Sequence, residues 1–341
     1  MFPFNVSDPE CPAAIRDHYL NKIHPLPEEA WLAQPTHPRA WYALAEDHSY
    51  IRALKRYTAS LKSWTLPRRG HTIDFPAIMA IWNLSEDSFS SIADTDGAST
   101  FAHASHLVAS GAAVIDIGAE ATNPAATPIS PTTERERLEP ALRWLVPQNI
   151  PISLDSFRLD TVEWAAQAHY IDIVNDIGGP EQTVDRYEAL FKIIREHQLG
   201  CILMAWHDHA HAFYSFEECI DNIRLQLDSK LSVAFECGVD MDSIVVDPGI
   251  GFGNGIQNDL SLIHEGAPNL MGTGRPVLIG HSRKRCLGLA TDRQVHERDY
   301  ATAIASAMAF RSGAKLVRVH HPEGSFDAKN LLDAMKLIPS I

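Results

Sequence analysis

Polar side chains recur at the ends of short apolar runs in the second part of the chain, and their types suit binding chemistry. A buried run that ends in hydrogen-bonding groups usually presents them to a ligand. One such run, PAIMAIW, turns at once into Asn, Ser, Glu and Asp. The candidates found in this way are Asn83, Asp116, Asp155, Asn175, Asp247, Ser282, Lys284, Arg318 and His320, and the apolar Met204 lies at the end of a further run.

The acidic and amide members of this set suit a polar heterocycle. Asp155, Asn175 and Asp247 supply several acceptors and one amide donor, which a flat ring with several N–H groups could satisfy. Buried carboxylates need such partners, because without them burial costs several kcal/mol. Each residue alone could instead cap a helix or close a turn.

The basic members suit an anion. Lys284, Arg318 and His320, together with Asn83, offer groups for phosphate oxygens or for a metal–phosphate pair. The two groups together predict a pocket for a heterocycle joined to an anion.

The apolar runs themselves predict a barrel. They are bounded by turn residues, as strands buried on both faces should be, and they cover 77–82, 113–118, 152–155, 171–176, 201–206, 243–247, 276–280 and 315–320. Eight alternations with helical segments favour a (β/α)8 TIM barrel, an α/β fold whose chemistry gathers where the strands end. A doubly wound open sheet is the alternative, but no GxGxxG follows the first run.

Helix signals lie between the runs. Ser130 and Pro131 read as an N-cap and a first helical position, and Asp160 is a candidate cap for the segment that follows it. Residues 215–238 form one long helical pattern that ends at Gly238.

The first 70 residues differ in character from the rest. They are rich in Pro and aromatic residues, and the segment 38–64 reads as one long amphipathic helix. We therefore divide the chain into a mainly helical N-terminal extension, 1–70, and a barrel, 71–341. The extension could cover the barrel or form a dimer contact.

Composition limits the partners. The net charge is −14 and no basic block occurs, so neither nucleic acid nor a membrane is an expected partner. Scattered cysteines without a CxxC pair, and no signal peptide pattern, favour the cytoplasm.

The ordered motifs resemble those of dihydropteroate synthases. The series is N-x-x-x-D-S-F-S, D-I-G-x-E-x-T-x-P, I-S-x-D, N-D-I, D-P-G-I-G-F-G, S-R-K and R-V-H, and it covers residues 76 to about 338. That family has a (β/α)8 fold. It joins 6-hydroxymethyl-7,8-dihydropterin diphosphate to p-aminobenzoate, releases diphosphate and uses Mg²⁺. Members are commonly dimers.

The resemblance implies roles for individual residues. Asn83 would hold Mg²⁺ and the diphosphate, while Thr122, Arg318 and His320 would bind the anion. Ser282 and Phe89 would meet p-aminobenzoate. The pterin pocket would be lined by Asp155, Asn175, Asp247 and Lys284, with Asp116 and Met204 as further substrate contacts. Asn83, Lys284, Arg318 and His320 are the expected catalytic residues.

The departures from the family pattern cluster in two loops. In the first loop Ser85 and Glu86 replace Thr and Pro; in the second, Asn123 and Ala125 replace Arg and Gly. Outside these loops, His321 replaces an Asp and Asn254 a Lys. Three hypotheses follow: a divergent synthase, a paralogue that uses a pterin with another nucleophile, or a pterin-binding protein without catalysis.

A different class of function rests on a histidine-rich loop. His207, His209 and His211 alternate in HDHAH and could bind zinc in a metal-dependent barrel hydrolase, although a solvated loop is the simpler interpretation. Pterin-dependent methyltransferases are a further alternative, against which the SRK and DSFS motifs argue.

Overall fold

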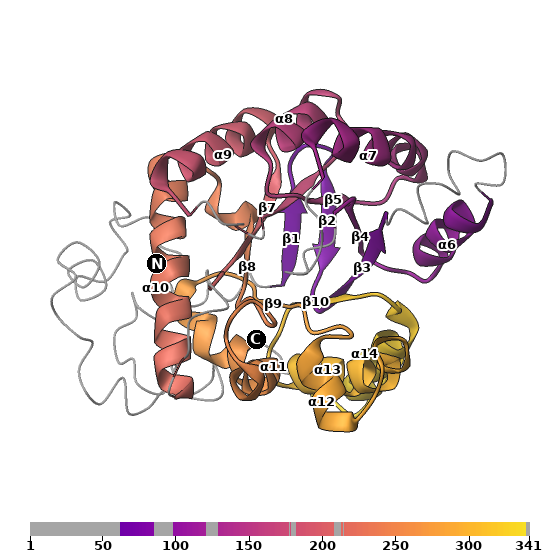
Figure 1. Ribbon diagram of the computed structural model, residues 1–341, viewed down its shortest axis with the longest axis vertical. Coiled ribbons are helices and arrows are strands. Elements are labelled where there is room, and N and C mark those ends of the chain that lie inside the picture. The colour runs from indigo at the N-terminus through magenta and orange to yellow at the C-terminus, as the bar shows by residue number, and fades with distance from the viewer. Residues whose placement is uncertain are drawn as a thin grey trace, which may run out of the picture.

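Eight parallel strands form a barrel (Figure 1). The computed structural model describes residues 62–84, 98–120, 129–176, 178, 182–207, 213 and 215–338. The strands are β3 (Ala77–Asn83), β4 (Val114–Gly118), β5 (Ile152–Asp155), β6 (Ile173–Asp176), β7 (Gly200–Met204), β8 (Ile244–Asp247), β9 (Leu278–Ile279) and β10 (Leu316–Val319). Their order is β8-β7-β6-β5-β4-β3-β10-β9, and one bridge between Val246 and Val277 joins the two ends. The predicted barrel is confirmed, and the open-sheet alternative is wrong.

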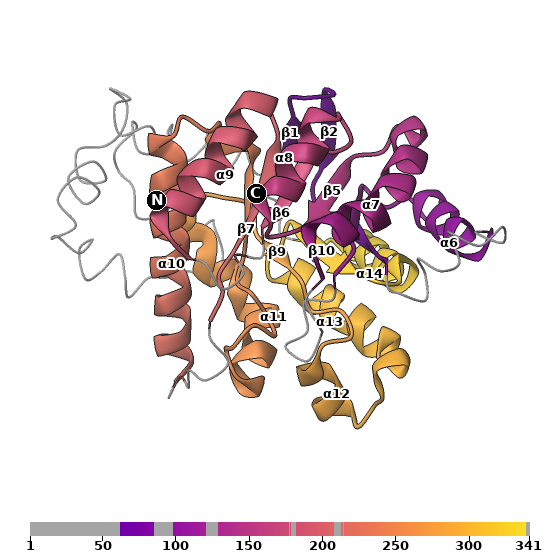
Figure 2. The ribbon, with the colours of Figure 1, turned by 45° about the horizontal axis from the view of Figure 1, so that its top comes forward.

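Helices surround the strands on the outside (Figures 1 and 2). They are α6 (Ala98–Ala109), α7 (Pro131–Leu145), α8 (Leu159–Gln167), α9 (Val184–His197), α10 (Phe216–Glu236), α11 (Ile256–Leu270), α12 (Arg285–Thr291), α13 (Asp299–Arg311) and α14 (Pro322–Ala334). Short 3₁₀ turns occur at η1 (Val146–Gln148), η2 (Met241–Ser243), η3 (Met271–Thr273) and η4 (Val295–Glu297).

Local signals explain where several helices begin and end. Ser130 caps α7 by accepting from the Thr133 amide at 3.0 Å, and Pro131 is the first helical residue, as predicted. The predicted cap of α8 is wrong, because Arg158 holds the N-cap position and Asp160 lies in the first turn. A carboxylate is still favourable there, near the positive end of the helix dipole.

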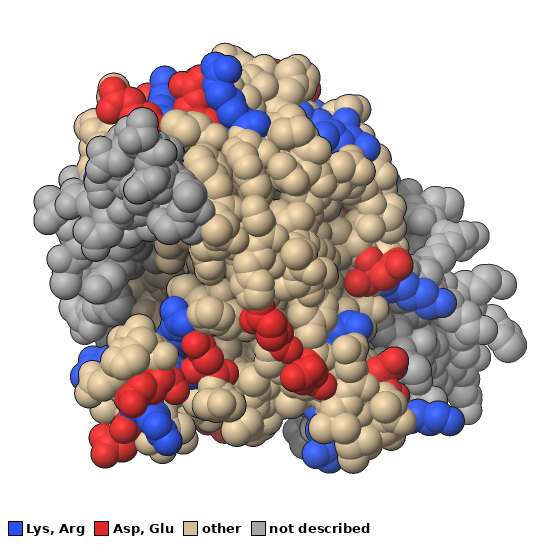
Figure 3. Space-filling model, turned by 90° about the vertical axis from the view of Figure 1, so that its right-hand side faces the viewer, with Lys and Arg blue, Asp and Glu red and all other residues tan. Residues whose placement is uncertain are grey.

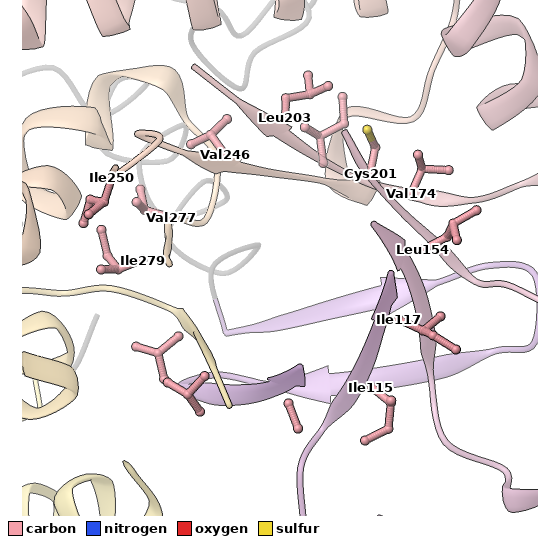
Figure 4. Close-up of a cluster of buried hydrophobic side chains, with 14 of the residues drawn as sticks. Ile115, Ile117, Leu154, Val174, Cys201, Leu203, Val246, Ile250, Val277 and Ile279 are labelled. Carbon is pink, nitrogen blue, oxygen red and sulfur yellow. The ribbon is translucent and has the colours of Figure 1, made fainter. Parts of the chain in front are cut away.

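The main core lies between the strands and the helices. Strand residues at alternate positions, such as Ile115 and Ile117 of β4, turn outward from the ring (Figure 4). Leu154, Val174 and Leu203 follow on the next strands, and all are fully buried. Because both faces of every strand are covered, the strands read as continuous apolar runs.

A hairpin closes the amino-terminal end of the barrel. β1 (Ser63–Leu66) pairs antiparallel with β2 (His71–Asp74), and the hairpin lies across the centre of the ring in Figure 1. Trp64 is fully buried against the barrel interior, and its Nε1 donates to the carbonyl of Ser243 at 3.0 Å. In Figure 2 the hairpin and α12 lie on opposite sides of the molecule.

The prediction that the N-terminal helix extends to residue 64 is wrong at its end. Ser63 and Trp64 belong to a strand, because the open end of a barrel must be covered by apolar side chains. The expected boundary between residues 70 and 71 falls inside this hairpin. Residues 1–61 lie outside the described part, so the helical extension and its role stay predictions.

Charges on the surface are mixed. Lys and Arg side chains on the face in Figure 3 are interspersed with Asp and Glu around a broad uncharged area. Among the described residues, no helix is both long and apolar enough to cross a bilayer.

Candidate functional site

A cavity of about 120 Å³ opens where the strands end. It is lined by Ile81, Asn83, Glu120, Asp155, Gly280, Ser282, Lys284, Arg318 and His320. The barrel therefore brings together the predicted residues Asn83, Asp155, Ser282, Lys284, Arg318 and His320. The candidates Asp116, Asn175 and Asp247 are connected to this wall by the contacts described below.

Arg318 ties two carboxylates together on one side of the cavity. Its Nε donates to Oδ2 of Asp116 at 2.6 Å, and its Nη2 donates to Oδ2 of Asp155. Asn175 adds a donor to the same Asp116 oxygen, at 3.2 Å. The second oxygen of each carboxylate, Oδ1 of Asp116 and of Asp155, is buried and accepts no hydrogen bond within the described part of the chain. These two oxygens are suited to accept N–H groups from a ligand.

The charges in this network shift each other's protonation. Burial raises the pKa of Asp155 to about 7; the charge of Arg318 opposes the shift and Asp116 adds to it. Burial by itself would lower the pKa of Arg318, but the charges of Asp116 and Asp155 outweigh it and hold the pKa above its usual value. The guanidinium therefore keeps its charge, and Asp155 titrates near neutral pH.

The loop after β8 holds a second pair of charges. Oδ1 of Asp247 accepts from the Gly249 amide at 2.7 Å, and Nζ of Lys284 donates to the carbonyl of Ile250. The ammonium also lies 4.4 Å from the ring centre of Phe252. Burial raises the pKa of Asp247 and lowers that of Lys284, and in each case the charge of the other residue opposes the shift.

Ser282 and His320 form a hydrogen-bonded pair on the cavity wall. The His320 amide donates to Oγ of Ser282 at 3.1 Å, and the same Oγ lies 2.9 Å from Nδ1 of His320. We assign the hydroxyl proton to the bond with Nδ1, which places the imidazole proton on Nε2. Burial, followed by the charge of Arg318, lowers the pKa of His320 to about 3. His320 is thus a neutral donor at physiological pH.

Asn83 ends β3, and its exposed side chain lines the cavity. Its carboxamide oxygen is a hard ligand of the kind that Mg²⁺ accepts, and Mg²⁺ usually takes few protein ligands and completes its shell with phosphate oxygens and water. The residues present therefore fit a magnesium ion held jointly by Asn83 and a bound diphosphate. The described residues contain no cluster of three His, Cys, Asp or Glu side chains that could hold a metal alone.

Met204 lies at the end of β7 and is buried. Its carbonyl accepts from the buried ammonium of Lys230 at 2.6 Å, which fixes this strand end. The candidates Phe89 and Thr122 lie outside the described residues, as do Ser85, Glu86, Asn123 and Ala125.

Glu120 lines the cavity but was not among the predicted site residues. It pairs with Arg158, whose Nη1 also lies 3.3 Å from Oε2 of Glu134. Ser156 donates to the same Glu134 carboxylate at 2.8 Å. The position of Glu120, two residues beyond β4 in the second strand-end motif, was the signal that could have identified it.

The histidine-rich loop is only partly described. Nδ1 of His207 lies 3.0 Å from Nε2 of Gln226, and its ring packs edge-on against Phe213 with centres 4.8 Å apart. His209 and His211 lie outside the described residues. His207 thus has the contacts of a packed core histidine.

Known proteins with similar sequences share this barrel. The family model described as pterin binding enzyme matches residues 79–320. A dihydropteroate synthase of Mycobacterium leprae is 33% identical over 270 residues, covering 75% of this chain and 92% of the relative. One of Neisseria meningitidis serogroup C is 31% identical over 279 residues, covering 80% and 97%.

Solved structures agree with the sequence matches. The dihydropteroate synthase of Xanthomonas albilineans with 4-aminobenzoic acid superposes with a TM-score of 0.71 at 29% identity, covering 82% of this chain and 99% of that one. The Burkholderia cenocepacia enzyme complexed with 7,8-dihydropteroate gives a TM-score of 0.68 at 27% identity, covering 78% and 94%. The fold, the strand-end residues and these matches show that the chain belongs to the pterin-binding enzyme family and is a homologue of the dihydropteroate synthases.

Proposed function

We propose that the protein is a dihydropteroate synthase, which joins 6-hydroxymethyl-7,8-dihydropterin diphosphate to p-aminobenzoate. The observation that carries the proposal is the pair of buried carboxylate oxygens, Oδ1 of Asp116 and of Asp155, which accept no hydrogen bond from the described residues. A bound ring rich in N–H groups would supply the missing donors. The relatives at 31–33% identity carry this activity in their names.

The pterin end of the substrate would lie against the acidic wall. Asp116, Asp155 and Asp247 would accept from ring N–H groups. The amide of Asn175 donates to Asp116 and would hold that carboxylate in place. Lys284 would donate to a ring acceptor, since this residue lines the cavity.

The diphosphate end would lie against the basic wall. As the bond between the pterin methylene carbon and the diphosphate oxygen breaks, both electrons go to that oxygen. Arg318 supplies positive charge and His320 supplies its Nε2–H to the leaving group. A bound Mg²⁺ at Asn83 would neutralise further charge on the diphosphate.

The second substrate needs no strong base. An arylamine nitrogen is unprotonated at neutral pH, so its lone pair can form the new C–N bond, after which the nitrogen releases a proton to water. The neighbour bound to 4-aminobenzoic acid supports this choice of nucleophile. We place Ser282 at the carboxylate of this substrate, and the resemblance puts Phe89 near its ring.

Two narrower hypotheses keep pterin binding and differ in what happens to the bound pterin. The chain could use another nucleophile, or bind a pterin without catalysis, because the sequence departures fall in the loops expected to close over the arylamine. The metal-dependent hydrolase stays the alternative of another class, because His207 is the one histidine of its loop within the described residues. A homodimer and a cytoplasmic location complete the proposal.

Product analysis separates these hypotheses. The purified protein would be incubated with dihydropterin diphosphate, p-aminobenzoate and Mg²⁺, with dihydropteroate followed by mass spectrometry and diphosphate by a coupled assay. Formation of both products supports the synthase. Diphosphate release alone would indicate another nucleophile, and pterin binding with neither product would indicate a binding protein.

An arginine at position 123 tests the altered loop. If the missing cation limits the reaction, Asn123→Arg should lower the KM for p-aminobenzoate and leave the affinity for the pterin substrate unchanged. An unchanged KM would show that the loop serves the second substrate in another way.

A further inference from the structure

The loop between β8 and α11 has a backbone that only glycine permits at several places. Gly249, Gly251 and Gly253 have φ of 74°, 82° and 85°. A Cβ on Gly249 would lie 2.0 Å from the carbonyl oxygen of Ala205, and one on Gly253 would lie 2.6 Å from that of His207. The loop backbone therefore packs closely against the residues that follow β7. Glycine is conformationally permissive, so we expect side-chain hydrogen bonds to fix this loop in a single conformation.

Two buried side chains supply that support. Asn254 is 1% exposed, and its Nδ2 donates to the Gly249 carbonyl at 2.7 Å and to Oδ1 of Asp259 at 3.2 Å. The same Asp259 oxygen accepts from the Gly251 amide at 2.8 Å. Asn254 and Asp259, which we call the loop brace, thus fix the backbone on both sides of residue 250.

The braced backbone holds both charges of the second pair. The amide of Gly249 donates to Asp247, and the carbonyl of Ile250 accepts from Lys284. A small displacement of residues 249–251 would move both of these partners away from their charges at once. Asn254 and Asp259 are 1% and 4% exposed, and hydrogen bonds join them to the loop backbone and to each other.

We infer that Asn254 and Asp259 are positioning residues, which fix the 249–251 backbone so that Asp247 and Lys284 present a matched acceptor and donor to the pterin ring. The inference rests on the proposed function and deepens it, because it assigns pterin affinity to residues that do not touch the pterin. Asn254 stands where the family pattern has Lys, so an amide brace at this position is a departure of this chain from that pattern.

The brace also contributes charge. The ionisable groups that act on Lys284 are Asp247, Arg318, Asp259 and Cys286. Burial lowers the pKa of Lys284, and the negative charges of Asp247 and Asp259 oppose the shift. Removing the charge of Asp259 should therefore let Lys284 lose its proton at a lower pH.

Asn254→Asp is the sharpest test of the geometry, because it keeps the shape of the side chain but replaces the donating NH₂ with an acceptor. The new carboxylate would lie against the Gly249 carbonyl oxygen and the Asp259 carboxylate, and both of these would repel it. We expect dihydropterin diphosphate, measured by calorimetry with Mg²⁺, to bind about tenfold more weakly. The matched control is Asn222→Asp on α10, whose Oδ1 already accepts from Gln226 and should keep doing so, with affinity unchanged.

Asp259→Asn tests the second half of the brace and its charge. It should weaken pterin binding less than Asn254→Asp, and should move the alkaline limit of binding to lower pH, which a merely structural role would not do. If wild-type protein binds no pterin, the proposed function fails. If wild-type protein binds and both variants are folded, with unchanged affinity and an unchanged pH profile, the inference is overturned. Should Asn254→Asp fail to fold, the pH profile of Asp259→Asn decides.

Discussion

Arg318 reaches across a neighbouring strand to Asp116, and its Nε donates to Oδ2 of that carboxylate at 2.6 Å. Arg318 is on β10 and Asp116 is on β4, and both strands pair with β3, which lies between them. The pair therefore spans two strand spacings over the carboxyl ends of the barrel. Asp116 is fully buried, so the pair ties β10 to β4 beside the cavity that Arg318 lines.

Arg318→Lys should show how much the fork geometry matters. Lysine keeps the charge but has a single ammonium, which cannot donate from Nε and Nη2 to two carboxylates in the same geometry. We expect the free energy of unfolding, measured in urea, to fall by about 1–3 kcal/mol, and pterin affinity to fall with it. Arg318→Ala should cost about 3–5 kcal/mol, since it leaves buried carboxylates without their cation.

A surface pair provides the control for that comparison. Arg143 pairs with Glu139 on the exposed side of α7, and its side chain is 67% exposed. Arg143→Lys should leave the urea midpoint unchanged, because a solvent-exposed ion pair contributes little to stability. Equal effects at Arg143 and Arg318 would contradict the role assigned to the buried fork.

Stability should depend on pH through Asp155. Burial raises its pKa to about 7, whereas an unfolded aspartate titrates near 3.9. Between about pH 4 and 7 the folded chain holds a proton that the unfolded chain has released, so the free energy of unfolding falls as pH rises and levels off above pH 7. Asp155→Asn should flatten this slope in urea titrations at several pH values. An equally steep slope in the variant would assign the titration to another group, such as Asp247.

The strand ends could be predicted from the sequence because each buried run stops at a polar residue. Residues 152–155 were predicted as a strand and form β5 with the same limits. The pair of Arg318 and Asp116 could not be predicted, because the two residues lie 202 positions apart and periodicity carries no information on which side chains meet. Knowing the strand order of a barrel is necessary before such a pair can be named.

Errors arose where tertiary contacts override a local signal. Asp160 looks like a cap, yet α8 starts earlier, at Leu159. The N-cap position belongs to Arg158, whose side chain makes ion pairs with Glu120 and Glu134. Trp64 continues an amphipathic pattern that is typical of a helix, yet it lies in a strand because the barrel end needs an apolar cover.

The Ser282–His320 pair predicts which substitutions should preserve diphosphate release at the proposed anion site. His320 acts as a neutral donor through Nε2, because its pKa is lowered to about 3 by burial and by Arg318. His320→Gln can place an amide N–H near the same point, so single-turnover diphosphate release should fall by less than about tenfold, whereas His320→Ala should reduce it by about a hundredfold. Equal losses in both variants would mean that the ring itself, rather than its N–H, is required.

Ser282→Ala should also slow diphosphate release, but through its effect on the tautomer of His320. Without the hydroxyl, Nδ1 loses its partner and the imidazole can adopt either tautomer, so part of the population would present no proton to the leaving group. We expect diphosphate release to slow by roughly tenfold, with pterin affinity unchanged. A weaker affinity for the pterin, measured by calorimetry, would instead place Ser282 at the pterin end of the cavity.

The hairpin should stabilise the barrel without taking part in binding. Trp64 is fully buried, donates to the Ser243 carbonyl and packs closely on Gly200. Trp64→Ala should therefore lower the free energy of unfolding by about 3–5 kcal/mol, whereas Leu225→Ala, at a side chain that is 70% exposed, should change it by less than about 0.5 kcal/mol. Below the urea midpoint the Trp64 variant should bind the pterin substrate as tightly as the wild type, because the hairpin and the cavity lie at opposite ends of the strands. A loss of affinity in the folded variant would show that the two ends of the barrel are coupled, and would refute a purely structural role for the hairpin.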